Sequence, residues 1–223
     1  MTGLMSSENW IGALPPEVRT AIEGRMSAFV VPAGAMLKDA GDAPTAVYQV
    51  QAGFLRLLGL HRDGQQTLIQ IYRAGNSFGE TAIVARRPFN HTTVALTEVH
   101  GRALLAADFW DLYHRHPEIP EALCRKFATI VSRQFEMREL LATHRLGTLV
   151  ALFFKNLAEY CGEPDGTGEI HLGIPLTQSD MAEHLGVTRQ GVQREIGVLK
   201  RAALIAKRNS RWSILDIERL KNV

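Results

Sequence analysis

The stretch 176–212 constrains the fold more than any other part of the chain. It reads LTQSDMAEHLGVTRQGVQREIGVLKRAALIAKRNSRW, in which two short helical patterns flank one glycine. Thr177, three residues before Asp180, is typical of a helix N-cap with an acidic capping-box partner. Gly186 supplies the turn, because glycine readily adopts a left-handed backbone. Thr188 is a second N-cap, and the stretch therefore predicts a helix-turn-helix.

The second of these helices has an apolar side and a polar side. Val192, Ile196 and Leu199 recur at helical spacing and predict the buried side. The residues on the outer side include Arg189, Gln190, Gln193 and Arg194. A helix of this kind fits the DNA major groove, where arginine pairs with guanine and glutamine pairs with adenine. We therefore expect these four side chains to read bases.

A short hairpin follows the second helix. Residues 205–206 and 212–214 read as strands, and Arg208-Asn209-Ser210 is a turn signal between them. A hairpin behind a recognition helix is a wing, and Lys207, Arg208 and Arg211 near its tip would lie close to phosphates. Glu195 is the only acidic residue from position 187 to 211, against seven basic ones. This local excess, on a chain with a formal net charge of +2, indicates a partner with a phosphate backbone.

In the first half of the chain the apolar residues recur with a different spacing. Residues 1–28 are expected to be mostly helical, and from about residue 29 to 105 the apolar residues alternate. The expected strands include 47–51, 54–60, 67–72, 93–99 and 102–105, with glycine turns and an Asp63-Gly64 hairpin signal. Short strands of this kind predict an antiparallel sandwich or barrel. A non-strand insertion, 78–83, can direct backbone N–H groups into a pocket.

A long helix is expected from residue 118 to 143. Its apolar seam is predicted to consist of Leu123, Phe127, Ile130, Gln134, Met137 and Leu141, spaced 4, 3, 4, 3 and 4. A heptad seam with charged flanks favours pairing with a second copy of the helix. A symmetric dimer also suits DNA binding, because paired half-sites mirror a two-fold axis. Gln134 interrupts the seam and either fixes its register or meets a ligand there.

These patterns predict an α+β protein with three parts. Residues 1–117 form an N-terminal antiparallel β-roll or jelly-roll sensor domain with a leading helix. Residues 118–145 form the dimerisation helix and a hinge near His144-Arg145. Residues 146–223, which open with an apolar core helix, form a C-terminal winged helix-turn-helix domain.

Composition narrows the class of protein. No stretch approaches the roughly 20 apolar residues needed to cross a membrane. The N-terminus lacks the basic region and apolar run of a secretory signal, so a cytoplasmic protein without a membrane partner is expected. Cys124 and Cys161 are the only cysteines, which excludes a four-cysteine iron–sulfur or zinc site in one chain. No metal ligand set is predicted.

The order of barrel, long helix and winged helix-turn-helix resembles the CRP/FNR superfamily of bacterial transcription regulators. The resemblance covers nearly the whole chain. It is carried by Gly53, Asp63-Gly64, Gly75, Phe78-Gly79-Glu80 and the segment LTQSDMAEHLGVTRQGVQREIGVLKRAALI. It implies that Arg189 and Arg194 read guanines, and that RNA polymerase is a further candidate partner. Gln190 stands where a glutamate is common in the family, so a shifted consensus site is expected. The positions where the family holds phosphates are Thr177, Ser179, Thr188 and Arg208.

The resemblance also implies an effector pocket. Its expected residues are Gly79, Glu80, Thr81, Asn90, His91, Thr92, Gln134 and Phe135. Gly79 and Glu80 match the cyclic-nucleotide-binding members, but Asn90-His91 replaces the Arg-Ser or Arg-Thr pair that holds the cyclic phosphate. Loss of a charge-assisted contact costs roughly 1.5–3 kcal/mol. We therefore expect a signal other than ordinary cyclic AMP. The cofactor is unknown: a cyclic nucleotide is one candidate, haem on His91 is a weaker one, and no iron–sulfur cluster is expected.

Two other classes of function compete with a homodimeric transcription regulator. A cupin-like metal enzyme would need clustered histidines, but the barrel histidines, His61, His91 and His100, are isolated. No nucleophile–base arrangement or Walker loop occurs either, so an enzyme is not expected. A ligand-binding module that does not touch DNA would not need the basic recognition helix.

Overall fold

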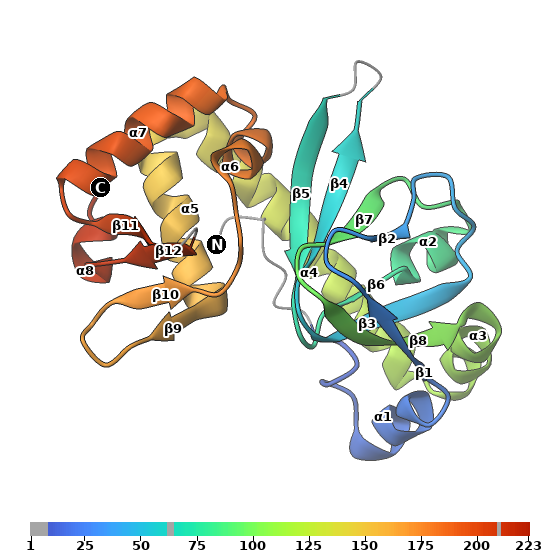
Figure 1. Cartoon of the computed structure of the whole chain (residues 1–223). Coiled ribbons are helices and arrows are strands. Elements are labelled where there is room, and N and C mark those ends of the chain that lie inside the picture. The colour runs from blue at the N-terminus through green and yellow to red at the C-terminus, as the bar shows by residue number, and fades with distance from the viewer. Residues whose placement is uncertain (1–8, 62–64, 209–210) are drawn as a thin grey trace. The chain divides into compact units, whose positions relative to one another are not determined.

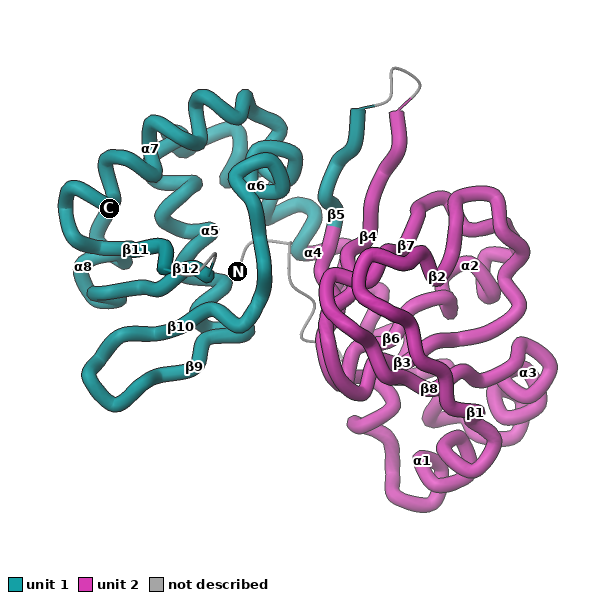
Figure 2. Tube along the Cα trace, viewed as in Figure 1, with its two compact units in different colours: residues 1–5, 63–69, 133–223 teal, residues 6–62, 70–132 magenta. Residues whose placement is uncertain are grey.

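The computed structural model describes residues 9–61, 65–208 and 211–223. The chain divides into two compact units (Figure 2), of which one holds 6–62 and 70–132 and the other 1–5, 63–69 and 133–223. We call them the sensor unit and the C-terminal unit. The boundary falls inside the long helix, so this helix contributes residues to both units.

Antiparallel strands build most of the sensor unit (Figure 1). They are β1 (Ser27–Val31), β2 (Met36–Lys38), β3 (Ala46–Ala52), β4 (Leu55–Leu60), β5 (Gln66–Tyr72), β6 (Ser77–Phe78), β7 (Thr92–Ala95) and β8 (Val99–Leu105). Residues 66–69 at the start of β5 are counted with the C-terminal unit. One four-stranded sheet has the order β1-β8-β3-β6 and another the order β2-β7-β4-β5. A cluster of buried side chains includes Val50, Leu55 and Val99 from strands of both sheets, so the predicted β-roll is confirmed.

A short helix, α2 (Glu80–Ala85), interrupts the strands between β6 and β7. Its N-cap is Gly79, whose φ of 100° is unfavourable for a residue with a Cβ atom. A Cβ atom here would lie 2.6 Å from the carbonyl oxygen of Ala46 on β3. Glycine therefore lets α2 begin directly against the sheet, and this places Glu80 in the interior.

Three more helices complete the sensor unit: α1 (Pro16–Glu23), α3 (Ala106–Arg115) and the first part of α4 (Glu118–Thr143). Their apolar faces form a second buried cluster, to which α1 contributes Ile22, α3 contributes Phe109 and α4 contributes Leu123. Phe127 packs against the same cluster. The prediction that Leu123 and Phe127 face a partner helix is therefore wrong, because the first turns of α4 are needed to close the core of their own unit.

An outward apolar stripe on α4 lies one position along from the predicted seam. It comprises Cys124, Ala128, Val131, Phe135 and Ala142, all exposed. With Arg138, which is also exposed, these positions are spaced 4, 3, 4, 3 and 4. Phe135 is 68% exposed. A shift of one residue rotates a stripe by about 100° around a helix, which is why the heptad spacing alone did not fix the outward face.

The C-terminal unit is a winged helix-turn-helix. Its elements are α5 (Leu146–Cys161), β9 (Gly162–Pro164), β10 (Ile170–Leu172), α6 (Gln178–Leu185), α7 (Arg189–Arg201), β11 (Ile205–Arg208), β12 (Arg211–Ile214) and α8 (Ile217–Leu220). Strand order β11-β12-β10-β9 gives one antiparallel sheet. Trp212 is fully buried, with its ring 5.1 Å from that of Phe154 and its indole N–H donating to the carbonyl of Leu176 at 3.0 Å. These contacts join α5, the wing and the start of the helix-turn-helix.

Two predicted turns, at Asp63-Gly64 and Asn209-Ser210, lie outside the described residues. Among the residues that the structure does describe, no helix is long and apolar enough to cross a membrane.

Candidate functional site

Two N-caps set the geometry of the helix-turn-helix. Thr177 and Asp180 form the predicted capping box: the Thr177 hydroxyl accepts from the Asp180 N–H at 3.1 Å, and the Asp180 carboxylate accepts from the Thr177 N–H at 2.7 Å. Gly186 is left-handed with φ 65°. The Thr188 hydroxyl accepts from the Gly191 N–H at 3.1 Å. Loss of an N-cap costs roughly 1 kcal/mol, so these residues fix where both helices begin.

The recognition helix α7 separates its two sides as the sequence predicts. Val192, Ile196 and Leu199 are buried. The predicted base-reading residues, Arg189, Gln190, Gln193 and Arg194, are all exposed on the opposite side. The structure thus brings the four together as one polar surface of a 13-residue helix, and their role in base reading stays a prediction.

Glu195 orients one of these arginines. Its carboxylate accepts from the Arg194 Nε at 3.1 Å. The Glu195 side chain is mostly covered whereas that of Arg194 is 73% exposed, so the acid is the fixed partner and the arginine the presented one. The Nε bond leaves the terminal NH₂ groups of the guanidinium free for the two-pronged contact that arginine makes with guanine.

The wing adds exposed cations beside this helix. Lys207, Arg208 and Arg211 are exposed on β11 and β12, as the sequence predicts for phosphate contacts. Arg208 donates to the Glu169 carboxylate at 3.2 Å. Lys207 places its Nζ 5.0 Å from the centre of the Trp212 ring, a cation–π contact. Of the other predicted phosphate contacts, Thr177 and Thr188 are exposed and Ser179 is half-buried.

The sensor unit contains a buried ion pair that the sequence did not reveal. Glu80 at the start of α2 is 1% exposed, and Lys126 from α4 is 4% exposed. The Lys126 ammonium contacts the Glu80 Oε1, and it also donates to the Ser77 carbonyl at 2.8 Å and to the Ser77 hydroxyl at 3.0 Å. An ammonium has three donors, so these contacts use the hydrogen-bonding capacity of Lys126. Glu80 Oε2 has no partner among the described residues.

The other predicted effector residues differ in exposure, and their place in an effector pocket stays a prediction. Thr81 and Asn90 are exposed, and Gln134 and Phe135 are exposed on α4. Thr92 is buried, and its hydroxyl donates to the Asp39 carboxylate at 2.6 Å. His91 is half-buried, and burial lowers the pKa of its imidazole. The polar contacts of Glu80 in the described part of the chain are with Lys126 and Ser77.

One cluster in the described part of the chain has the geometry to hold a metal ion. Ligand atoms of Asp165, Glu169 and His171 lie within 4.8 Å of one another. Each already has a protein partner: Asp165 accepts from Thr167, Glu169 accepts from Arg208, and His171 contacts both Asp165 and Ser213. The cluster is explained as a hydrogen-bonded hairpin, and we assign no metal to it.

The sequence did not predict the ion pairs of Lys126, Glu195 and Glu169. Glu169 and Arg208 are 39 positions apart, and Lys126 and Glu80 are 46 apart. Only the folded backbone brings such pairs together. For Lys126 a signal was present: it lies between Leu123 and Phe127 on the inward side of α4, where a lysine requires a buried partner.

Comparison with known families matches both units. The family described as "Cyclic nucleotide-binding domain" matches residues 28–116, and the family described as "Crp-like helix-turn-helix domain" matches residues 147–223. A CRP-like cAMP-activated global transcriptional regulator of Mycobacterium tuberculosis is 24% identical over 206 residues, which are 92% of this chain and 91% of the relative.

Solved structures show the same fold. FixK2 from Bradyrhizobium japonicum superposes with a TM-score of 0.77 at 18% identity, covering 88% of this chain and 96% of that one. A transcriptional regulator of the CRP/FNR family from Thermus thermophilus gives a TM-score of 0.72 at 24% identity, with 88% and 97% covered.

The buried pair gives a prediction about stability. Replacing Lys126 with Met should cost roughly 3–5 kcal/mol, because the Glu80 carboxylate is then buried without a counter-ion. Adding Glu80→Gln to that variant should restore more than half of the loss, since no charge then remains in the interior. Urea unfolding of both single variants and the double variant measures the coupling. If the two single costs simply added in the double variant, the two charges would not stabilise each other.

Proposed function

The chain belongs to the CRP/FNR family of DNA-binding transcription regulators, and we propose that it acts as a homodimer whose two α7 helices read a two-fold symmetric DNA site. The observation that carries this proposal is the exposed set Arg189, Gln190, Gln193 and Arg194 on a rigidly capped helix. Base-edge donors on one helix face, with exposed cations on an adjacent wing, suit sequence reading flanked by phosphate contacts.

Within each half-site, we assign guanine to Arg189 and Arg194 and adenine to Gln190. Thr177, Ser179, Thr188, Lys207, Arg208 and Arg211 are the proposed phosphate contacts. Glu169 then weakens the proposed phosphate contact of Arg208, because the Glu169 carboxylate and a DNA phosphate compete for the same guanidinium.

The proposed dimer forms through the outward stripe of α4. A parallel pair of identical helices places each stripe residue opposite its own copy across the two-fold axis. Val131 and Phe135 are 52% and 68% exposed, and burying such side chains is what drives helix pairing in water. The seam proposed here uses Cys124, Ala128, Val131, Phe135 and Ala142.

The signal that controls DNA binding is proposed to be something other than ordinary cyclic AMP. A cyclic phosphate needs a charge-assisted partner, and Asn90 brings no charge and is exposed. Glu80 already has Lys126 and Ser77 as partners. The alternative is a cyclic-nucleotide regulator with a non-standard phosphate pocket; the matched cyclic nucleotide-binding family favours that alternative.

The relatives compared are transcription regulators rather than enzymes, and we propose no catalytic role. The proposed place of action is the cytoplasm, with RNA polymerase as a further partner on DNA.

Arg194→Ala should weaken binding to the matched operator by about 1–3 kcal/mol and relax base choice at one position of each half-site. Lys207→Ala is the matched control: it should weaken binding about equally for all sequences and reduce the salt dependence. Titration of a selected operator and of single-base variants, at several salt concentrations, measures both. An Arg194→Ala protein that discriminates bases as the parent does would contradict the assignment.

Mild oxidation with diamide should link two chains through Cys124, because the proposed parallel seam brings the two Cys124 residues together across the axis. Non-reducing electrophoresis measures the product. Cys161 is half-buried at the end of α5, so Cys161→Ser should still cross-link whereas Cys124→Ser should not. Equal cross-linking of both variants would rule out this seam.

Thermal unfolding should not change when cyclic AMP or cyclic GMP is added at millimolar concentration. A nucleotide at 100 times its dissociation constant would stabilise the protein by about 2.7 kcal/mol, which is several degrees for a chain of this size. A clear upward shift would overturn the proposed signal and support the non-standard nucleotide pocket.

A further inference from the structure

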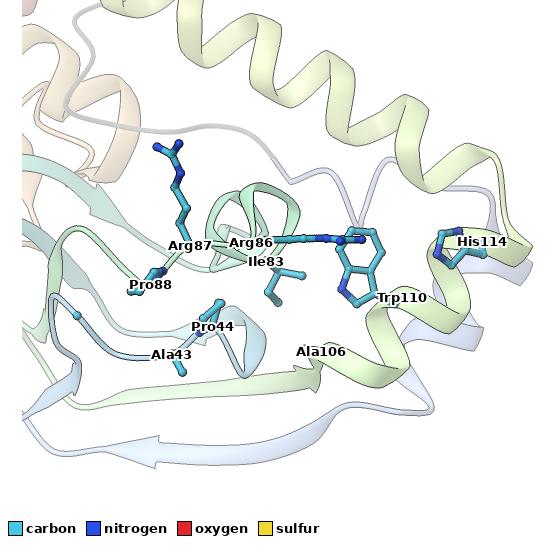
Figure 3. A pocket seen from close by; sticks show the side chains of 10 residues that line it. Ala43, Pro44, Ile83, Arg86, Arg87, Pro88, Ala106, Trp110 and His114 are labelled. Atoms are coloured by element: carbon cyan, nitrogen blue, oxygen red, sulfur yellow. The ribbon is translucent and has the colours of Figure 1, made fainter.

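A concave site lies beside the C-terminal end of α2, and Glu80 is not among the residues that line it. It is a cavity of about 510 Å³ within the sensor unit, between the end of α2, helix α3 and the loop that precedes β3. Its lining includes Pro44, Ile83, Arg86, Arg87, Trp110 and His114 (Figure 3). Small-molecule sites in proteins are commonly clefts of roughly 300–1,000 Å³, so the size is suitable for a metabolite.

The wall of this cavity is apolar and aromatic. Ile83 is buried, and the Trp110 ring is half-buried, so both offer fixed surfaces. The His114 ring lies nearly parallel to that of Trp110, at 20° and 5.8 Å between centres. Ring systems in ligands bind well on such surfaces, because flat π faces and edges attract each other in addition to the apolar area that is buried.

The rim of the cavity is positively charged. No carboxylate is among the side chains that line it, and within the described residues neither Arg86 nor Arg87 forms an ion pair. Two arginines that contact α3 are paired instead: Arg25 with Asp111 at 2.6 Å and with Asp108 at 3.4 Å, and Arg115 with Asp111 at 2.8 Å. A concave surface with one sign of charge concentrates ligands of the opposite sign.

The backbone holds Arg86 in an unusual position. Arg86 is left-handed, with φ 53° and ψ 43°, a conformation that glycine adopts more easily than a residue with a Cβ atom. Figure 3 shows its side chain extended toward Trp110, with Arg87 pointing in another direction. The guanidinium carbon lies 6.0 Å from the centre of the Trp110 ring. Arg86 closes α2: the Arg86 N–H donates to the Ile83 carbonyl and the Arg87 N–H donates to the Ala82 carbonyl, both at 3.1 Å, as in a Schellman cap.

We propose that this cavity is a binding site for a small ring-bearing organic acid. The ring packs on Trp110 and Ile83, and a carboxylate or phosphate accepts hydrogen bonds from the guanidinium group of Arg86, while Arg87 adds positive charge to the rim. Arginine suits this role because its planar fork matches both kinds of acid group.

The site is also connected to the buried ion pair. Helix α2 has only six residues; Glu80 at its start contacts Lys126 of α4, and Arg86 caps its end. A ligand that binds Arg86 therefore contacts the same short helix whose Glu80 forms the ion pair with α4. This consequence rests on the proposed function of α4 in the dimer, whereas ligand binding itself does not.

Phenyl phosphate is a suitable probe, because it combines one ring with one acid group. Given the affinity per atom of small ligands, we expect a dissociation constant on the order of 1 mM. Indole N–H signals of the ¹⁵N-labelled full-length protein report binding. Trp10 and Trp212 are buried and do not line the cavity, so the Trp110 signal, assigned with Trp110→Phe, should shift most. Inorganic phosphate and phenol should each bind at least about tenfold more weakly than phenyl phosphate.

Arg86→Gly separates binding from folding. The variant removes the cation and also the left-handed strain, so its thermal midpoint should stay the same or rise while its affinity for phenyl phosphate falls at least about tenfold. Arg115→Gln, on α3 but outside the cavity lining, should leave the affinity unchanged. The assay contains no DNA, so its result is independent of operator binding.

Three results would overturn the proposal: no Trp110 shift up to 10 times the expected dissociation constant, inorganic phosphate binding as tightly as phenyl phosphate, or unchanged affinity in Arg86→Gly. A selective Trp110 shift that is lost in Arg86→Gly and kept in Arg115→Gln would support it.

Discussion

The sensor unit depends on one buried electrostatic contact, the pair between Glu80 and Lys126. Removing two ions from water costs several kcal/mol for each, so each of these side chains tolerates the interior only because the other is present. Ser77 completes the arrangement by accepting two hydrogen bonds from the ammonium. The partners come from β6, α2 and α4, so one charged contact specifies how α2, the sheet and the long helix fit together.

The helix-turn-helix of the C-terminal unit was predictable from its sequence, because its determinants are local. Thr177, Gly186 and Thr188 define both helices through contacts within three or four residues, and Val192, Ile196 and Leu199 define the buried side by period alone. The polar face of α7 is then the side of the helix opposite these three buried residues. The hairpin signals at 63–64 and 209–210 are equally local, although both tips fall outside the described residues.

The sensor unit was predictable as a class of fold but not as a site. Period and glycine turns indicate a β-roll, yet nothing local shows that Lys126 reaches Glu80, or that Arg86 extends toward Trp110. The predicted outward face of α4 was wrong for a related reason. Two stripes, one position apart, both have heptad spacing, and the choice between them depends on Leu123 packing beside Ile22 and Phe109, which are distant in sequence.

Helix α4 contains no glycine, and its only proline is Pro120 in the first turn. Sharp kinks in helices require such residues or an inserted group, so α4 has no obvious place to bend between the lysine that faces inward and the phenylalanine that faces outward. The length of the helix between these two residues is consequently restricted, because any added residue rotates one face relative to the other. One residue added between Lys126 and Phe135 would turn the outward stripe by about 100° relative to the inward face, whereas seven would turn it by only about 20°. A change of seven or of eleven residues therefore keeps the two faces within about 20° of their present alignment, because seven residues fall just short of two turns and eleven just exceed three.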